Sequence, residues 1–267
     1  MVAKTVPNDR GVPYPEHPPV TFRRLPASVQ TDELVAWWWI CEWDVPVGQH
    51  SNQQVLAFPA LNFTVDDRGA GISGATSSAS TRELTGRGWV IGALLKPAAT
   101  PVFTFDPASL RNRLEPLHLP GLHSRVADRA ATGHLDSAVD VLSRWLVARA
   151  GALDDSALTA NHMGRLATTD PQITSVSGLA DAVGVSQSGL YRLARRYVGV
   201  SPYSMIRRRR LQEIAERIRL HPGESLADVS VHFGMTDQAH LGREFNSAFG
   251  ITLGDYRSTC SAAQRHP

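Results

Sequence analysis

The sequence has little of what marks several classes of protein. Its 267 residues include only two cysteines, Cys41 and Cys260, too few for a disulfide framework or a four-cysteine zinc site. No apolar run reaches the roughly 18 residues that suggest a membrane-spanning helix. Residues 1–19 are polar and proline-rich, without the apolar segment of a secretory signal. We therefore expect a cytoplasmic protein with no membrane partner and a flexible tail at residues 1–19.

Signatures of enzymes are also missing. The chain has no His-x-His pair, no Gly-x-Ser-x-Gly and no glycine loop for phosphates or dinucleotides. The histidines of the front part, His50, His118, His123 and His134, are scattered and lack a patterned glutamate partner. We therefore expect no enzymatic activity, no cofactor and no metal.

Charge is almost balanced overall, at +2, but it is unevenly placed. Residues 172–257 hold eleven arginines, no lysine and eight acidic residues. Residues 1–171 hold fifteen basic and seventeen acidic residues. A mildly acidic front and a basic back indicate a polyanionic partner for the back.

The front part is predicted to be rich in β-strands. Short β-branched or aromatic runs, bounded by Gly, Pro, Asp or Ser, stand at residues 33–45, 53–67, 88–97 and 100–105. Such runs predict a small sheet or barrel over residues 20–125. Residues 68–81 are rich in Gly, Ser and Thr, and they predict a mobile loop or the rim of a pocket.

The tryptophans of the first run have two interpretations. Alternate side chains of a strand point to opposite faces, so Trp37 and Trp39 share one face and Trp38 lies on the other. One face could line a pocket for an aromatic or amphipathic effector. The candidate lining residues are Trp37, Trp39, Phe58, Phe63 and Trp89. Plain core packing with a dimer surface explains the same cluster, and both interpretations stay open.

Near residue 133 the hydrophobic period becomes helical. Apolar residues from Leu135 to Leu146 repeat at i, i+3, i+4, i+7 and i+11, and Gly151 closes the helix. We expect residues 126–154 to form a connecting helix and linker. Further helices are predicted at about 155–168, 177–183, 187–198, 203–220, 226–232 and 237–249, followed by a tail at 258–267.

The helical part contains the same sequence pattern twice, at residues 179–202 and 226–253. Each copy begins with Leu-Ala-Asp and continues with a glycine, a hydroxyl N-cap and a helix that carries Leu-x-Arg and ends at a glycine. These residues are Gly184, Ser186, Leu190-Tyr191-Arg192 and Gly199, and then Gly234, Thr236, Leu241-Gly242-Arg243 and Gly250. The offset between the copies is 50 residues at the first glycine and 51 from Leu-x-Arg onward.

Two short helices joined by a glycine turn form a helix-turn-helix, whose second helix can enter the major groove of DNA. The second helices are predicted to pack through Leu190, Leu193, Ala194, Tyr197, Leu241, Phe245 and Phe249. The candidate base-reading residues on their other faces are Gln187, Ser188, Tyr191, Arg192, Gln238, His240 and Arg243. Gln and Arg can bind adenine and guanine edges through two hydrogen bonds. The candidate phosphate contacts are Arg195, Arg196, Arg209 and Arg257.

Four consecutive arginines, residues 207–210, open the helix between the two copies. Taking Leu211, Ile214, Ala215 and Ile218 as its buried stripe, steps of about 100° place Arg209 opposite that stripe. Arg209 is therefore expected to face solvent or phosphate. Arg207 falls within the buried arc, where its stem would pack and its charged end would reach water.

Two such copies joined by one long helix resemble the AraC/XylS family of bacterial transcription regulators over residues 155–257. The resemblance rests on "LADAVGVSQSGLYRLARRYVGVSP", "RLQEIAERI" and "GMTDQAHLGREFNSAFGITLGDYR". It departs from the family pattern at Ser230, Met235 and Leu253, which are core or turn positions. The pattern has an arginine directly before Leu211, so the resemblance gives Arg210 a structural or inter-unit bond.

The resemblance implies an α+β chain with a β-rich, cupin-like front domain and a double helix-turn-helix domain behind it. In this family the two second helices enter adjacent major-groove segments about one turn, roughly 34 Å, apart. The implied partners are double-stranded DNA, a small-molecule effector, RNA polymerase and a second copy in a homodimer, at the bacterial nucleoid. The segments "QQVLAFPALNFTV", "GWVIGALLKPAATPVF" and "LRNRLEPL" resemble an uncharacterised sensor domain found before this module.

Two alternatives stay open. The front domain could be a dimerisation or packing module without a ligand. The helical back could bind a protein partner instead of DNA, in which case its affinity for random duplex would lack a steep dependence on salt.

Overall fold

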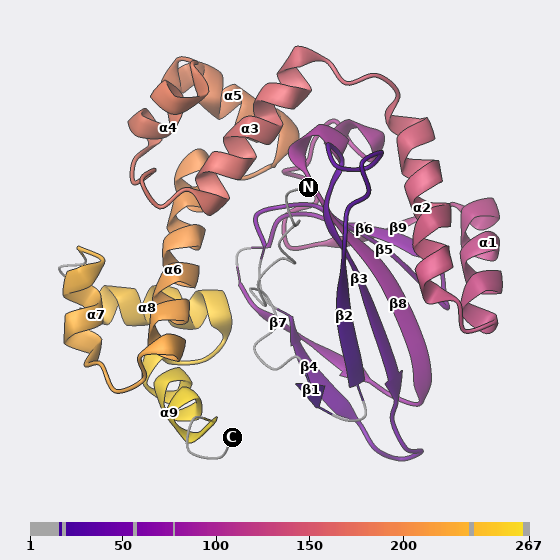
Figure 1. The fold of residues 1–267 in the computed structure, drawn as a ribbon, viewed down its shortest axis with the longest axis horizontal. Helices are drawn as coiled ribbons and strands as arrows, with labels where there is room; N and C mark the ends of the chain where they lie inside the picture. The colour runs from indigo at the N-terminus through magenta and orange to yellow at the C-terminus, as the bar shows by residue number, and fades with distance from the viewer. Residues whose placement is uncertain (1–15, 18–19, 56–57, 77, 235–237, 264–267) are drawn as a thin grey trace.

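The computed structural model describes residues 16–17, 20–55, 58–76, 78–234 and 238–263 (Figure 1). Its strands are β1 (Glu16–His17), β2 (Val20–Pro26), β3 (Val35–Asp44), β4 (Ser51–Val55), β5 (Asn62–Asp66), β6 (Ala70–Ser73), β7 (Ser80–Leu84), β8 (Arg87–Leu95) and β9 (Leu114–Leu117). Its helices are the 3-10 helix η1 (Pro97–Val102), α1 (Pro120–Ala131), α2 (Leu135–Ala150), α3 (Asp155–Thr169), α4 (Val176–Val183), α5 (Gln187–Tyr197), α6 (Pro202–Leu220), α7 (Leu226–His232), α8 (Gln238–Phe249) and α9 (Leu253–Ala263). The predicted α+β class is confirmed. The predicted tail at residues 1–19 lies almost wholly outside the described residues.

The front domain is built on one antiparallel sheet with the strand order β1-β2-β3-β8-β5-β6-β9, so the predicted sheet or barrel is a sheet. Strands β4 and β7 pair separately as a two-stranded ribbon. The long strands β3 and β8 form the centre, where Ile40 pairs with Ile91 and Trp38 with Ala93. These paired residues are buried against α1 and α2, which cover one face of the sheet (Figure 1).

The tryptophans of β3 alternate between the two faces, as predicted. Trp38 is 1% exposed and lies in the core beside α1 and α2. On the opposite face the ring of Trp39 lies directly over Gly92, where a Cβ atom would come within 2.1 Å of the ring. Trp39 Nε1 also donates to Asn62 Oδ1 at 3.0 Å. Only glycine at position 92 lets this ring lie flat on the sheet.

The five candidate pocket residues do not share one face. Trp37 contacts the ring of Phe58 on the face that carries Trp39. Phe63 and Trp89 instead belong to the core on the side of α1 and α2. On the neighbouring strands Phe63 pairs with Ala93 and Trp89 pairs with Glu42. Directly paired residues point to the same face, so this register sets the side on which both rings lie. The prediction of one pocket lined by all five residues is therefore wrong.

Helices α1 and α2 form a hairpin that belongs to the core of the front domain. Val126 of α1 and Leu142 and Leu146 of α2 are buried, and Trp145 stacks on Phe63 with the ring centres 5.4 Å apart. Residues 126–154 are predicted to connect the two domains. Their apolar stripe instead covers the sheet, so they belong to the core of the front domain. Gly151 ends α2 as predicted, with φ at 61°.

Two further predictions of secondary structure in the front domain are wrong. Residues 100–105 form no strand, because Pro97 starts η1 and Pro101 lies within it, and proline cannot donate to a strand ladder. Residues 68–81 are no simple loop, since they contain β6 and the start of β7. Ile72 of β6 is buried and pairs with Phe63.

The helical domain consists of two units joined by α6. We call α3, α4 and α5 the first unit and α7, α8 and α9 the second unit, and each has its own buried cluster. The six predicted helices are present, with bounds within one or two residues. Helix α9 contradicts the predicted tail at 258–263, while 264–267 lie outside the described residues. The sequence signal for the start of α9 is Thr252. Its hydroxyl accepts from Asp255 N at 3.1 Å and donates to the Asp255 carboxylate at 2.7 Å.

The first unit is locked to the front domain by buried hydrogen bonds. The Asn161 amide of α3 accepts from Ala98 N at 2.9 Å and donates to the Glu33 carbonyl at 2.8 Å. The Thr100 hydroxyl of η1 donates to the Tyr197 carbonyl, at the end of α5, at 2.6 Å. Ala98 itself belongs to the buried cluster of the first unit. The front domain and first unit therefore pack as one body.

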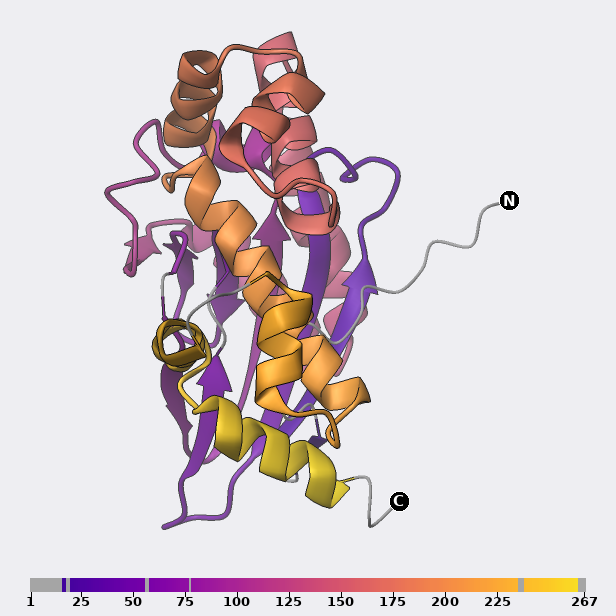
Figure 2. The same cartoon turned by 90° about the vertical axis from the view of Figure 1, so that its left-hand side faces the viewer.

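The second unit lies on the other side of the sheet from α1 and α2. Figure 1 shows the sheet between the α1–α2 hairpin and helices α6 to α9, and Figure 2 shows α6 to α9 in front of the sheet. Within the part of the chain that the structure describes, no helix is both long and apolar enough to cross a membrane.

Candidate nucleic-acid interface

Local capping sets the direction of α5 in the first unit. Gly184 adopts a left-handed conformation after α4, with φ at 76° and ψ at 31°, which a glycine accepts at little cost. The Ser186 hydroxyl then accepts from Gly189 N at 3.1 Å and caps α5, as predicted. Leu190, Ala194 and Tyr197 are at most 1% exposed, so α5 has a single packed side.

The other side of α5 is exposed and polar. It carries Gln187, Ser188, Tyr191, Arg192, Arg195 and Arg196, all exposed to solvent. Tyr191 is 45% exposed on this side. The predicted orientation of these residues is confirmed, and their contacts with DNA stay predictions.

The second unit repeats this arrangement. Ser225 caps α7 by accepting from Asp228 N at 3.1 Å, and Gly234 follows α7 with φ at 61°. Leu241, Phe245 and Phe249 are buried on the packed side of α8, as predicted. The predicted cap Thr236 lies outside the described residues, as do the side chains of Gln238 and His240.

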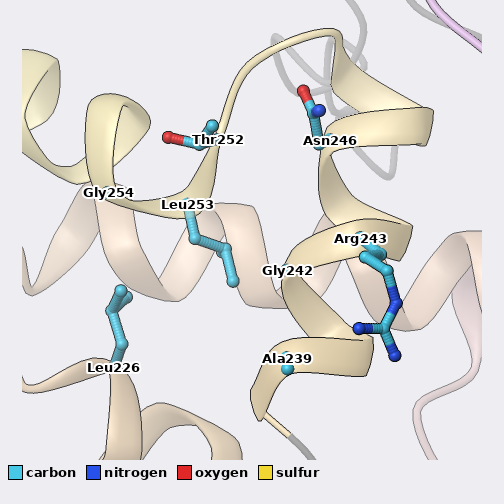
Figure 3. A pocket seen from close by; sticks show the side chains of 8 residues that line it. All are labelled: Leu226, Ala239, Gly242, Arg243, Asn246, Thr252, Leu253 and Gly254. Atoms are coloured by element: carbon cyan, nitrogen blue, oxygen red, sulfur yellow. The ribbon is translucent and has the colours of Figure 1, made fainter.

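The exposed side of α8 borders a shallow hollow between α7, α8 and α9 (Figure 3). Arg243 and Asn246 are exposed residues one helical turn apart on α8, and Leu226 and Leu253 lie across the hollow from it. Asn246 was missed as a candidate, although it stands 51 residues after Arg195. Applying the offset of 51 residues to Arg195, as well as to Arg192, would have identified it.

The two exposed faces differ in charge. Helix α5 presents Arg192, Arg195 and Arg196. At the same offset α8 presents Arg243, Asn246 and Ser247. The candidate phosphate contacts of α5 therefore have no charged equivalents on α8. Arg257, the candidate on α9, is half-buried.

Helix α6 joins the two units and packs a different side on each. Ser201 caps it and Pro202 opens it, and its 19 residues span roughly 28 Å. Met205 and Ile206 belong to the buried cluster of the first unit. Residues from Leu211 onward, including Ile214, belong to that of the second. Figure 2 shows α5 and α8 on the same side of α6.

The change of packed side within α6 overturns the prediction for Arg209. Arg209 follows Met205 and Ile206 at i+4 and i+3, so it continues the side that faces the first unit. It is 1% exposed, and its guanidinium donates to the Ile173 carbonyl at 2.6 Å and to the Glu213 carboxylate at 2.7 Å. A side chain held this way cannot reach a DNA phosphate. The periodicity of the C-terminal half alone could not show this.

The other three arginines hold the second unit. Arg207 is exposed, in contrast to its predicted place in the buried arc, and forms an ion pair with Glu244 of α8 at 2.6 Å. Arg208 donates to the Ala248 carbonyl at 3.0 Å and lies 4.8 Å from the centre of the Phe249 ring. Arg210 donates to the Phe233 carbonyl at the end of α7, the inter-unit bond that the resemblance implied.

Burial gives Arg208 an unusual environment. It is 7% exposed, and desolvation lowers the pKa of its guanidinium to about 10. The group therefore remains charged at neutral pH. At the far end of α6, Arg217 binds Glu224 through two hydrogen bonds of 2.8 and 2.9 Å, which lower the pKa of that carboxyl.

Other chemistry finds no support among the described residues. They contain no group of three or more His, Cys, Asp or Glu side chains placed to hold a metal ion. Burial raises the pKa of the Cys41 thiol to about 11, which keeps it protonated and unreactive. The chemistry that the exposed faces offer is hydrogen bonding and positive charge from α5 and α8.

Comparison with known proteins agrees with this geometry. Residues 179–259 match a family described as a helix-turn-helix domain, and residues 23–115 match a domain of unknown function, DUF6597. An AraC-like transcription regulator of Streptomyces antibioticus is 32% identical over 125 residues, which are 46% of this chain and 39% of that protein. The match thus spans well under half of that relative.

The similar solved structures are only distantly related to this chain. ToxT from Vibrio cholerae O395 aligns with a TM-score of 0.39 and 10% identity, over 91% of this chain and 97% of its own. The AraC-like transcriptional activator CuxR aligns with a TM-score of 0.22 and 14% identity, over 75% and 88%. Likeness of this degree supports no inference about ligand or activity.

The helical part of this chain is therefore a double helix-turn-helix domain. The predicted resemblance to AraC/XylS regulators is confirmed by the family match and by the Streptomyces relative.

We expect Arg209→Ala to destabilise the fold by roughly 1–3 kcal/mol, because it leaves the buried Ile173 carbonyl without its donor. Chemical denaturation of the full chain measures this free energy of unfolding. The matched control is Arg192→Ala, an exposed arginine of α5, which should change it by less than about 0.5 kcal/mol. Equal effects of the two substitutions would show that the hydrogen bond from Arg209 to the Ile173 carbonyl does not stabilise the packing of α6 on the first unit.

Proposed function

We propose that this chain is a sequence-specific, double-stranded DNA-binding transcriptional regulator of the AraC/XylS type. In this proposal α5 and α8 each enter a major groove, and α6 places them on adjacent turns of one face of the duplex. The length of α6, roughly 28 Å, suits units that read segments about one DNA turn, roughly 34 Å, apart.

One observation carries the proposal. Each of the two helices α5 and α8 buries one side and exposes a side of hydrogen-bonding or charged residues, and both helices pack against one joining helix. A helix that only packed within a core would not need Gln187, Tyr191 and Arg192 in solvent. Arg192 and Arg243 are the proposed guanine readers, and Gln187 and Gln238 the proposed adenine readers. Ser188, Tyr191 and His240 are further proposed base contacts.

The front domain has two proposed roles. Effector sensing would use the sheet face with Trp37, Trp39 and Phe58, since Phe63 and Trp89 are in the core on the other face. Pairing of two copies would use the outer side of the α1–α2 hairpin. Contact with RNA polymerase is a proposal that rests on the resemblance alone. A front domain without a ligand, acting through packing, is supported by its buried hydrogen bonds to the first unit.

The competing function is a helical domain that binds a protein. A titration of the full chain against random-sequence duplex at increasing salt separates the two. A DNA binder should lose affinity linearly on a log–log plot, because bound arginines release counterions. Micromolar or weaker binding with a flat slope would favour a protein partner.

In the same titration we expect Arg195→Ala to weaken binding to all duplexes alike and to reduce the salt slope by about one, since one phosphate contact is lost. Arg125→Ala, an exposed arginine of α1 on the far side of the sheet, is the control and should leave the slope unchanged. An Arg195→Ala slope equal to that of wild type would remove Arg195 from the phosphate contacts.

Arg243→Ala should behave differently from Arg195→Ala. Losing a reader of a base edge should cost about 1–3 kcal/mol at one base pair and relax the preference there, while other positions keep theirs. Affinities for a panel of duplexes with each base pair of a selected site replaced in turn measure this. An unchanged preference at every position would show that Arg243 is not a base reader.

A further inference from the structure

Phe58 of the front domain lies between the sheet and the second unit. On one side its ring meets the ring of Trp37 edge-on, with the centres 5.7 Å apart. On the other side it packs against the buried cluster of the second unit, which includes Ile214, Phe245 and Phe249. Ala79, which precedes β7, packs against the same cluster.

The backbone at Phe58 is itself fixed. Phe58 N donates to the Thr76 hydroxyl at 3.1 Å, and Thr76 N donates to the Phe58 carbonyl at 3.0 Å. Both main-chain groups of Phe58 are thus held by one residue across the segment that contains β5 and β6. The ring is therefore presented to the second unit from a main chain that two hydrogen bonds hold in place.

The two units differ in how they are held to the front domain and in the charge of their reading helices. The first unit is locked to the front domain through Asn161 and Thr100. The second unit also exposes fewer charges on its reading helix, with Arg243 where α5 has Arg192, and Asn246 and Ser247 where α5 has Arg195 and Arg196. Fewer phosphate contacts give it less intrinsic affinity for DNA. Its contribution to binding then depends on how well it is held in place beside the first unit.

The contact with Phe58 leaves the reading face of the second unit open. Arg243 and Asn246 are exposed in the arrangement in which Phe58 packs on the cluster behind them. The contact is therefore compatible with DNA in the groove that α8 would enter.

We propose that Phe58 is a positioning residue for the second unit: by packing on its cluster it holds α8 where it can read the second half-site. The inference rests on the proposed function. It also makes the front domain part of the DNA-reading apparatus, because Trp37 and Phe58 connect the aromatic sheet face to the second unit.

The test uses duplexes selected from a random library by the full wild-type chain. The second half-site is the one that contains the base pair whose preference is relaxed in Arg243→Ala. The affinity for the selected duplex, divided by the affinity for the same duplex with the second half-site scrambled, measures what the second unit adds. For wild type we expect this ratio to be about tenfold or more. For Phe58→Ala we expect a ratio close to one, with binding to the scrambled duplex unchanged.

Three further variants sharpen the test. Phe22→Ala removes another partly buried ring of the same sheet face, stacked on Trp39 at 5.9 Å, and should keep the wild-type ratio. Phe58→Leu, which retains an apolar contact, should restore most of it. If Phe58→Ala does not fold by its thermal unfolding curve, Ala79→Glu replaces it, since a charge at that contact should lower the ratio in the same way.

The outcomes are distinct. A folded Phe58→Ala or Ala79→Glu protein with the wild-type ratio would overturn the inference, and so would a wild-type ratio of one. Selection of no sequence at all by the wild-type chain would instead overturn the proposed function.

Discussion

Four consecutive arginines at the start of α6 are the constraint on which the rest of the helical domain depends. Arg209 binds the first unit through the Ile173 carbonyl, while Arg207, Arg208 and Arg210 bind the second through Glu244, Ala248 and Phe233. Guanidinium groups suit this task because each offers several donors in a fixed plane. These four charges are used to fix the spacing between two helices, and the exposed arginines of the proposed DNA-binding faces lie on α5 and α8.

Much of the helical domain could be predicted from the sequence, because its signals are local. The caps Ser186 and Ser201, the glycine turns and the packed sides of α5 and α8 depend on residues a few positions apart. The place of Arg209 could not be predicted, because it depends on which unit covers each half of α6. That Phe63 and Trp89 lie on the opposite face of the sheet from Trp37 could not be predicted either, because it depends on the register between strands that are distant in sequence. Helix α9 was predictable from Thr252 and Asp255 and was missed.

The front domain is joined unequally to the two units. Buried hydrogen bonds to Asn161 and from Thr100 oppose independent motion of the first unit, since a small separation would leave buried polar groups unpaired. Phe58 and Ala79 of the front domain make apolar contacts with the buried cluster of the second unit. Apolar contacts are less directional than hydrogen bonds, so they constrain the orientation of the second unit less tightly.

Helix α6 is proposed to hold two DNA-reading helices at one fixed separation. The most direct measurement is the affinity of the full chain for its selected duplex after insertion of five base pairs between the half-sites. That insertion turns one half-site by about half a helical turn. The account predicts affinity no better than for a single half-site. Undiminished affinity, with both half-sites still protected in a footprint, would contradict it.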